Sequence, residues 1–317
     1  MSSQQLITHM NATLNPGEHI LSMLSRHHKF SGYRTYKRAL APLSNDIKRQ
    51  YPSAVYRPIY RDAFNVATTG TDYVKFLKAH TLLNWYLPFM PEQYQNLDSE
   101  EVVFPHFYYR FHATHDWRYC LNCMEDDLET CGAPYYHLEH QLPLQSECGV
   151  HNEKLYSGCH RCHVSWKNVD RLGFPTGKEC RVCEQALFPV DQFMDDDLRW
   201  LQNTSRDLLA SNVTAFKLEQ LQSAYQKALG LKSPNPKLSL SDKNKLKSLQ
   251  FDLDNFFDPC LYHTIFNNCE QKSGYKKTSS LHLYQVVFHK DKFFAPIVHL
   301  LIIRMLFGEL ENIPLQW

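Results

Sequence analysis

Two closely spaced pairs of cysteines lie near the middle of the sequence, Cys159 with Cys162 and Cys180 with Cys183, and seventeen residues separate the pairs. Each C-x2-C turn can direct two thiolates at one point, and two such turns supply the four thiolates of a tetrahedral zinc site. The residues between the pairs are strand-like from Val164 to Val169 and turn-forming from Gly173 to Gly177. This pattern is typical of a zinc ribbon, so the spacing predicts a structural zinc ion here.

A second set of candidate ligands lies upstream. Cys120 and Cys123 form another C-x2-C pair, and Cys148 with His151 follows after twenty-four residues. A cysteine pair combined with Cys-x2-His gives a Cys3His set, which is also tetrahedral. Because the Cys-Gly-Val-His turn repeats the spacing of a C-x2-C turn, we assign these four residues to a second structural zinc ion. Nearby residues offer alternatives to Cys148 and His151 as ligands: Cys131, His137, His140, His160 and His163.

Both predicted sites use four protein ligands and leave no position for water or substrate, which is typical of structural rather than catalytic zinc. The sequence also lacks the phosphate-binding loop, the dinucleotide-binding glycine pattern, G-x-S-x-G and H-E-x-x-H. His137 and His140 could form an acid–base pair, but the aromatic run over 135–143 favours a strand buried between the cysteine pairs. We therefore expect no enzyme; the catalytic alternative is a zinc-stabilised nuclease that uses one of these histidines.

The charge balance limits how this chain could bind nucleic acid. It has 317 residues, a formal net charge of +1 and 43% hydrophobic residues, the composition of an ordinary globular protein. A protein that coats DNA by bulk charge is far more basic, so contact with DNA must come from local patches. No export signal opens the sequence, and the longest apolar run, 297–307, is too short to span a bilayer. We expect a cytoplasmic protein without membrane contact, whose cysteines stay reduced.

The elements expected around the cysteines are mainly helices. Two short helical segments flank Gly32, and the second is basic, which is compatible with a helix-turn-helix. Further along, Asp195–Asp197 suit the first turn of a helix, and another helix should end at Gly230. The predicted fold is mainly α with small zinc-ribbon β elements. Its predicted domains are an N-terminal helical, helix-turn-helix-like domain over 1–115, a double zinc-binding module over 116–190 and a C-terminal helical domain over 191–317.

The cysteine-rich region resembles that of a known family. The stretches that carry the resemblance are Arg118–Asp126, Gly132–Tyr136, Gln141–Leu144 and Cys148–His151, with support from Asn15–Arg26, His80–Phe89 and the tail from Phe266 to His299. They are similar to the core of the TniQ/TnsD family of transposon target-site selection proteins. The sequence looks closer to the TnsD branch, although TnsD proteins that read a chromosomal site are usually longer.

The resemblance implies a non-catalytic adaptor in DNA transposition, in the cytoplasm of a bacterium. Such an adaptor recognises double-stranded target DNA and recruits an AAA+ ATPase regulator, which its N-terminal segment would dock, and through it the transposase. The alternative is a TniQ-type subunit of a CRISPR RNA-guided transposition complex. That subunit would act mainly through protein contacts, with the aromatic stretch 104–111 as an interface. A second copy of the chain, forming a homodimer, is a further expected partner.

A direct DNA reader needs exposed cations, because arginine and lysine make most contacts to phosphates and guanine edges. The candidates lie in the helix-turn-helix-like region and in the second zinc module. They are Arg26, Arg34, Lys37, Arg38, Arg161, Lys167, Arg171, Lys178 and Arg181. The other interpretation of each residue is a solvated surface charge.

Overall fold

The computed structural model describes most of the chain as two compact units. The described residues are 13–43, 52–67 except 54 and 56, 72–92, 116–189 except 165, 167, 168, 170–172 and 176, 194–211, 216–231, 239–265 except 262–264, and 283–314. The first unit comprises Met1–Leu83 and Thr114–Gln192, and the second comprises Asn84–Ala113 and Phe193–Trp317. The division into three domains stays a prediction.

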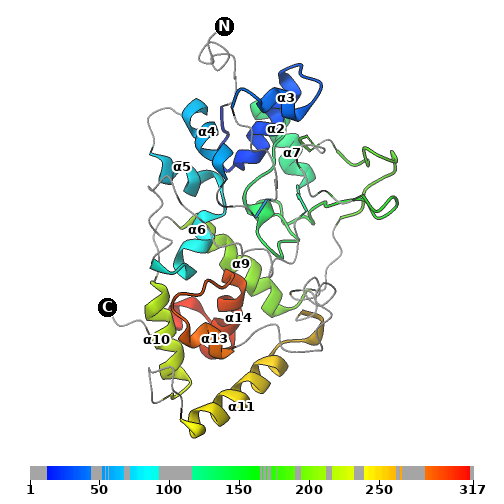
Figure 1. Cartoon of the computed structure of the whole chain (residues 1–317). Coiled ribbons are helices and arrows are strands. Elements are labelled where there is room, and N and C mark those ends of the chain that lie inside the picture. The colour runs from blue at the N-terminus through cyan, green and yellow to red at the C-terminus, as the bar shows by residue number, and fades with distance from the viewer. Residues whose placement is uncertain are drawn as a thin grey trace. The chain divides into compact units, whose positions relative to one another are not determined.

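Helices α2 (Ile20–Phe30), α3 (Tyr36–Leu40), α4 (Pro58–Ala67) and α5 (Tyr73–His80) form the N-terminal part of the first unit (Figure 1). Helix α2 packs against α3 and α4, and α4 packs against α5. The start of α2 is fixed by His19, whose imidazole accepts the amide hydrogen of Leu21 at 3.1 Å. Burial of the apolar face of α2, including Ile20 and Leu24, holds these helices together.

The pair α2–α3 has the order and turn that the sequence predicts around Gly32. This glycine has a φ of +73°, a left-handed conformation that carries the chain out of α2 at little cost. Thr35 then caps α3 by accepting the amide hydrogen of Arg38 at 3.3 Å. Tyr36 and Leu40 are buried, whereas Lys37 and Arg38 are exposed. Whether this helical pair reads DNA as a helix-turn-helix stays a prediction.

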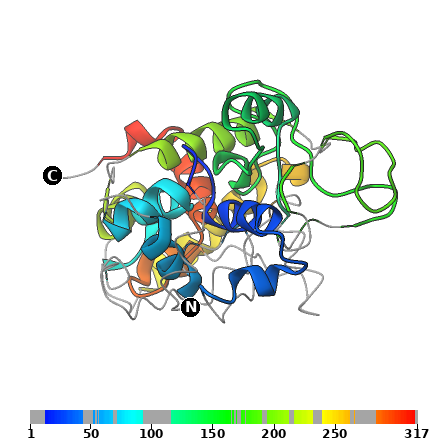
Figure 2. The same ribbon diagram turned by 90° about the horizontal axis from the view of Figure 1, so that it is seen from above.

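Helix α7 (Leu121–Cys131) opens the cysteine-rich part of the first unit and ends at Gly132, which has a φ of +72°. The following segment lies beside α2, as Figures 1 and 2 show: the amide of Tyr136 donates to Ser22 at 2.9 Å, and Glu18 forms an isolated β-bridge with His137. The strand predicted over 135–143 is wrong. The chain turns into the 3-10 helix η4 (Glu139–Gln141), because the Gln141 side chain donates back to the carbonyl of His137 at 2.9 Å.

The β content of the described residues is limited to isolated bridges. Within the cysteine-rich part they pair Tyr119 with Tyr156, Glu147 with Lys154, Tyr156 with Pro189 and Glu179 with Ala186. Val169, predicted to be strand-like, is helical. The prediction of a mainly helical fold is confirmed, and the small β elements are shorter than the strands of a ribbon.

The second unit is helical in its described residues. Helix α6 (Leu83–Tyr86) and the 3-10 helix η1 (Leu87–Phe89) stand at its boundary, and its other helices are α9 (Asp196–Ala210), α10 (Leu218–Ala228), α11 (Leu240–Phe256), α13 (Leu283–Phe288), α14 (Pro296–Phe307) and the 3-10 helix η5 (Leu310–Asn312). Helix α14 packs on α9, and α10 packs on α13. None of the helices in the described ranges is long and apolar enough to cross a bilayer.

The ends of these helices follow local chemistry. Asp196 and Asp197 lie in the first turn of α9, as predicted for the acidic triplet. Asp195 lies one residue earlier and caps the helix by accepting the amide hydrogen of Leu198 at 2.7 Å. Gly230, with a φ of +56°, lies just after α10, where the sequence places the stop. Helix α11 is capped by Ser239, whose hydroxyl accepts the amide hydrogen of Asp242 at 3.1 Å.

Candidate metal centres

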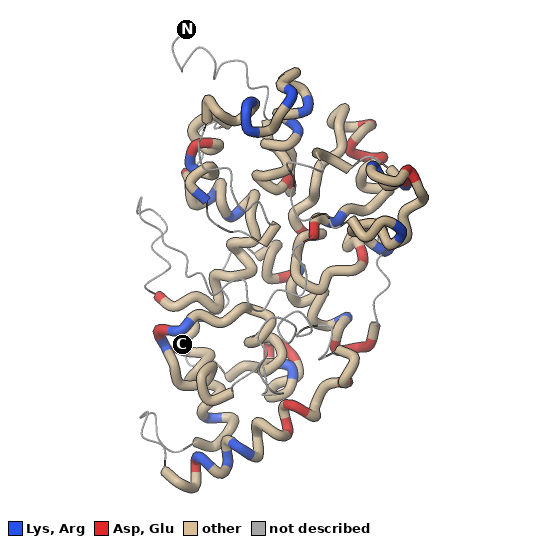
Figure 3. Tube along the Cα trace, turned by 45° about the vertical axis from the view of Figure 1, so that its right-hand side comes forward, with Lys and Arg blue, Asp and Glu red and all other residues tan. Residues whose placement is uncertain are grey.

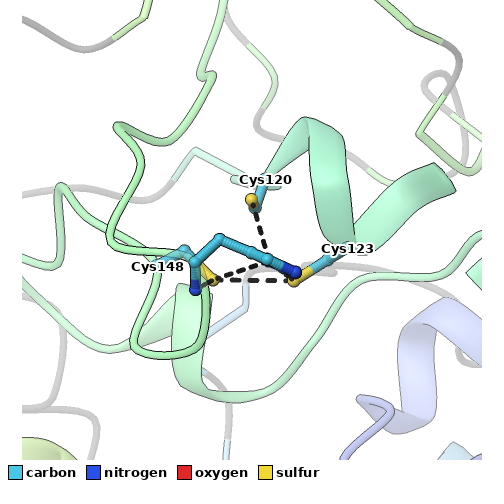
Figure 4. A group of neighbouring side chains, drawn as sticks. Cys120, Cys123 and Cys148 are labelled. Carbon is cyan, nitrogen blue, oxygen red and sulfur yellow. Dashed lines mark hydrogen bonds between the residues drawn. The ribbon is translucent and has the colours of Figure 1, made fainter. Parts of the chain in front are cut away.

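The first cluster joins the start of a helix to a tight turn. Cys120 is the N-cap residue of α7 and Cys123 lies in its first turn, while Cys148 faces them from the loop that follows η4 (Figure 4). His151 completes the group: its Nδ1 lies 3.6 Å, 3.3 Å and 3.7 Å from the sulfurs of Cys120, Cys123 and Cys148. The structure therefore brings together the four residues that the sequence assigns to one metal ion.

These separations match the edges of a tetrahedral site. With metal–sulfur bonds of about 2.3 Å and metal–nitrogen bonds of about 2.0 Å, tetrahedral angles give edges of about 3.5–3.8 Å. The sulfurs of Cys123 and Cys148 are 3.5 Å apart, and the histidine contacts lie in or near the same range. The cluster can hold a metal ion such as zinc within four protein ligands.

Asp126 orients the histidine of this cluster. Its carboxylate lies 3.1 Å from Nε2 of His151, so Nε2 carries the hydrogen and Nδ1 is free to face the three sulfurs. A carboxylate behind a histidine ligand is the usual way in which proteins fix the tautomer and the ring orientation at a metal site. Asp126 follows Cys123 by three residues on α7, which places both side chains on one face of the helix.

His140, one of the alternative ligands, lies beside the cluster rather than at its fourth corner. Its Nε2 is 3.4 Å from the sulfur of Cys148 and 3.9 Å from that of Cys123. It therefore approaches one edge of the sulfur triangle, whereas His151 faces all three sulfurs. Complete burial lowers the pKa of His140 to about 4, so its ring is neutral and can donate one hydrogen bond to a thiolate.

The second cluster is built from two turns. The sulfurs of Cys159 and Cys183 are 3.7 Å apart, and those of Cys162 and Cys180 are also 3.7 Å apart. All four sulfurs lie within 4.8 Å of one another, so this tetrad can hold a second metal ion. The structure thus groups the eight predicted ligands into the two predicted sets.

Three of the four ligand pairs share one backbone geometry. The residue after the second ligand is left-handed in each: Asn152, His163 and Glu184 have φ of 56°, 55° and 57°. The chain then closes as a tight hairpin, in which the amide of Cys148 donates to Glu153 and the amide of Cys180 donates to Gln185, both at 2.8 Å. The Cys-Gly-Val-His turn therefore repeats the geometry of the cysteine turns, as its spacing predicts, and this favours His151 as the fourth ligand.

Each cluster contains a thiol with a lowered pKa beside one with a raised pKa; in the first cluster, hydrogen bonds with Cys120 and Cys148 raise the pKa of Cys123. Hydrogen bonds from Cys123 and Cys148 lower the pKa of Cys120 to about 3. At the second cluster, the backbone amide of Cys162 lowers the pKa of Cys159 to about 7. Thiolates, and not thiols, are the groups that bind metal, so the lowered pKa values of Cys120 and Cys159 make these two sulfurs the readiest ligands near neutral pH.

Two buried arginines hold the first unit together around the clusters. Arg118 donates to the carbonyls of Leu142 and Gln145, at 2.6 Å and 2.8 Å, and so fixes the loop that leads to Cys148. Arg26 of α2 donates to the buried carboxylate of Glu18 from Nε at 2.8 Å and from Nη2 at 2.7 Å. Glu18 in turn precedes α2 and pairs with the segment after α7.

The second cluster belongs to a module that is attached to α2 and to residues just before α7. The amide of Trp117 donates to the carbonyl of Trp166 at 2.7 Å, and the rings of Tyr119 and Trp166 stack with centroids 5.4 Å apart. The hydroxyl of Ser25 on α2 donates to the carbonyl of Val169 at 3.3 Å. Loop geometry at the second cluster is therefore tied to the helical part of the same unit.

The nine predicted DNA contacts fall into three groups. Arg34, Lys37 and Arg38 around α3, and Arg161, Lys178 and Arg181 in the second zinc module, are exposed. Lys167 and Arg171 lie outside the described residues. Arg26 is buried against Glu18, so its guanidinium is committed to an internal ion pair and is not presented to a ligand. The aromatic stretch 104–111 and the tail from Phe266 to His282 also lie outside the described residues.

Residues 10–155 of the chain match the model of the TniQ family. Residues 10–155 thus carry a TniQ domain, as the resemblance indicated; the match does not distinguish the TnsD branch. A TniQ domain implies an adaptor role associated with DNA transposition. No protein of curated function matches the chain.

Proposed function

We propose that this chain is a non-catalytic target-selection adaptor of a bacterial transposon, which contacts double-stranded DNA and recruits an AAA+ ATPase regulator and the transposase. The observation that supports the proposal most directly is the placement of a closed Cys3His tetrad inside the TniQ domain, with a second closed tetrad directly after it. Four protein ligands at each centre leave no open position for a substrate, which favours a structural role.

Two zinc ions are the metals that suit these centres. Three thiolates with one imidazole, or four thiolates, at tetrahedral edges are ligand sets that zinc prefers. Because such ligands are dispersed in the unfolded chain, the binding free energy of zinc becomes folding free energy of this region. The first zinc would fix the turn at Cys148 against α7, and the second would fix the turns that present Arg161 and Arg181.

The exposed cations give the proposed DNA contacts. Figure 3 shows lysine and arginine along α2–α3 and in the second zinc module. In a chain with a net charge of only +1, such patches supply local attraction for phosphates. Arg26 is left out of the proposed contacts because of its ion pair with Glu18. The N-terminal segment remains the proposed docking site of the ATPase, and the cytoplasm the proposed compartment.

The test is a footprint of the purified, zinc-loaded chain on DNA that carries the insertion site of its element, with and without the ATPase regulator. Metal analysis of the same sample should give two zinc ions per chain, and Cys123→Ser and Cys162→Ser should each remove one. A protected tract without any partner supports direct reading of DNA. Protection that appears only with an RNA-guided complex would move the assignment to the CRISPR-associated type of adaptor. Cleavage of supercoiled DNA by the zinc-loaded chain would overturn the non-catalytic proposal.

A further inference from the structure

The end of helix α2 meets the second zinc module at an exposed aromatic pair. Phe30, the last residue of α2, stacks on Phe174 with ring centroids 6.0 Å apart and an interplanar angle of 17°. Phe30 is nevertheless 66% exposed. The ring of Phe30 is therefore accessible to a partner at the junction of two elements that are far apart in the sequence.

Two cations converge on the same junction. A Cβ built on Gly173 would lie 3.4 Å from Nζ of Lys29 and 3.1 Å from Nη1 of Arg181. These two cationic groups are therefore within about 7 Å of each other, at a separation where like charges repel. Arg181 is held there by its hydrogen bond to the carbonyl of Phe174, at 2.6 Å. The two charges thus come from different elements and flank the Phe30–Phe174 pair.

The surroundings of this junction are basic on the α2–α3 side. The stretch 19–43 contains no aspartate or glutamate, and its exposed cations include Lys29, Arg34 and Lys37. Figure 3 shows this run of basic residues along the tube. A partner that suits this surface is anionic, to pair with the cations, and carries flat rings, to stack on Phe30. A nucleic acid has both, because phosphates alternate with bases along each strand.

We propose that Lys29, Phe30, Phe174 and Arg181 form one DNA-contacting surface, in which Lys29 and Arg181 bind backbone phosphates and the Phe30 ring stacks on a base at a locally unstacked step. Exposed phenylalanines that enter a duplex do so where base stacking is opened, and cations beside them hold the backbone. The preferred ligand is therefore duplex DNA with a local distortion. This inference rests on the DNA-binding part of the proposed function and specifies its surface.

The second metal centre sets the geometry of this surface. Arg181 lies between the ligands Cys180 and Cys183, whereas Lys29 and Phe30 belong to α2. Loss of the second metal would let Arg181 move away from Lys29 without altering the ligands of the first centre. DNA binding should therefore depend on the second zinc ion in particular.

The experiment measures binding of the full zinc-loaded chain to two fluorescent duplexes, one fully paired and one with a short central mismatch bubble, over a series of salt concentrations. Lys29→Ala/Arg181→Ala should reduce the slope of log affinity against log salt by about two, since each lost phosphate contact contributes about one. Phe30→Ala should leave the slope unchanged and abolish about a tenfold preference for the bubble duplex.

Matched controls come from the same unit. Lys75→Ala/Lys154→Ala removes the same charge from exposed lysines elsewhere, and Phe188→Ala removes another exposed phenylalanine, which is 54% exposed. Circular dichroism and a content of two zinc ions verify that each variant is folded. Equal slopes in the two double variants, while the unaltered chain binds DNA, would overturn this surface and leave the proposed function standing.

Two other outcomes also overturn the inference. If the Lys29→Ala/Arg181→Ala variant binds both duplexes normally but no longer binds the ATPase regulator, the surface binds an acidic face of a protein partner and not DNA. If the unaltered chain binds neither duplex at any salt concentration, the DNA-reading part of the proposed function fails together with this surface.

Discussion

Replacement of Arg26 by methionine should destabilise the first unit strongly while leaving DNA binding intact. Arg26 makes two hydrogen bonds to the carboxylate of Glu18, at 2.8 Å and 2.7 Å, and Glu18 is fully buried. Without the guanidinium, the hydrogen bond that remains to this carboxylate among the described residues comes from the amide of Asn15, at 3.1 Å. Removing one partner of a buried ion pair costs about 3–5 kcal/mol, because a charge is left buried without compensation.

That cost converts to a large change in melting temperature. For a unit of this size each kcal/mol lowers the melting temperature by about 2–4 °C, so Arg26→Met should lower it by about 6–20 °C. Thermal and urea unfolding of the zinc-loaded chain, followed by circular dichroism, measures the change. The double variant Glu18→Gln/Arg26→Met removes the uncompensated charge and should recover most of the lost stability.

Two results would refute this reasoning. One is an Arg26→Met variant whose free energy of unfolding stays within about 1 kcal/mol of the unaltered chain, which would place the pair in a solvated setting. The other is a double variant as unstable as Arg26→Met alone, which would show that the loss comes from packing and not from charge. If a folded Arg26→Met variant binds DNA with a reduced salt dependence, Arg26 contacts a phosphate and was wrongly removed from the proposed DNA contacts.

Three further predictions concern other elements. His140→Ala should keep two zinc ions per chain but weaken zinc binding at the first centre by about 10–100-fold in competition with a chelator, because the sulfur of Cys148 loses the imidazole 3.4 Å away; unchanged affinity would show that this contact is incidental. Burial lowers the pKa of His299 to about 3, so the unfolded chain takes up a proton first as pH falls below about 6.5, and the stability of the second unit should decline toward pH 3 by up to about 1.4 kcal/mol per pH unit. His299→Leu should remove this decline in urea unfolding at pH 5 and pH 7, and an identical pH dependence in the variant would contradict the assignment. Asp195→Ala should cost about 1 kcal/mol through loss of the cap of α9, Asp195→Asn should cost less, and equal stability of both with the unaltered chain would show that the cap is dispensable.

The ligand sets were predictable from the sequence because the geometry of each pair is local. A Cys-x2-Cys or Cys-x2-His turn fixes the direction of both side chains within a few residues, so spacing alone predicts which residues converge. The same holds for helix ends: Asp195 and Gly230 act on adjacent backbone groups. The left-handed φ of Asn152 and Glu184 is part of the same local pattern.

Features that depend on distant contacts were not predictable in this way. Arg26 resembles a surface cation in sequence, and only the packing of Glu18 at the start of α2 makes it internal. The segment around His137 has the composition of a strand, but the Gln141 side chain and the approach of α2 turn it into η4. Asp126 carried a usable signal, since it lies one helical turn after Cys123 on the face that meets His151.

The attachment of the second zinc module to α2 has a consequence for how this chain can be divided. The segment that matches the TniQ family ends at residue 155, but the compact unit continues to Gln192. A fragment cut at residue 155 would strip the Trp166 ring from Tyr119 and leave the backbone of Trp117 without its partner carbonyl. The end of the segment that matches the family model and the end of the compact unit therefore differ. A chimera with a relative should fold when the junction lies at the end of the unit, and should fail to fold when it lies at the end of the matched segment.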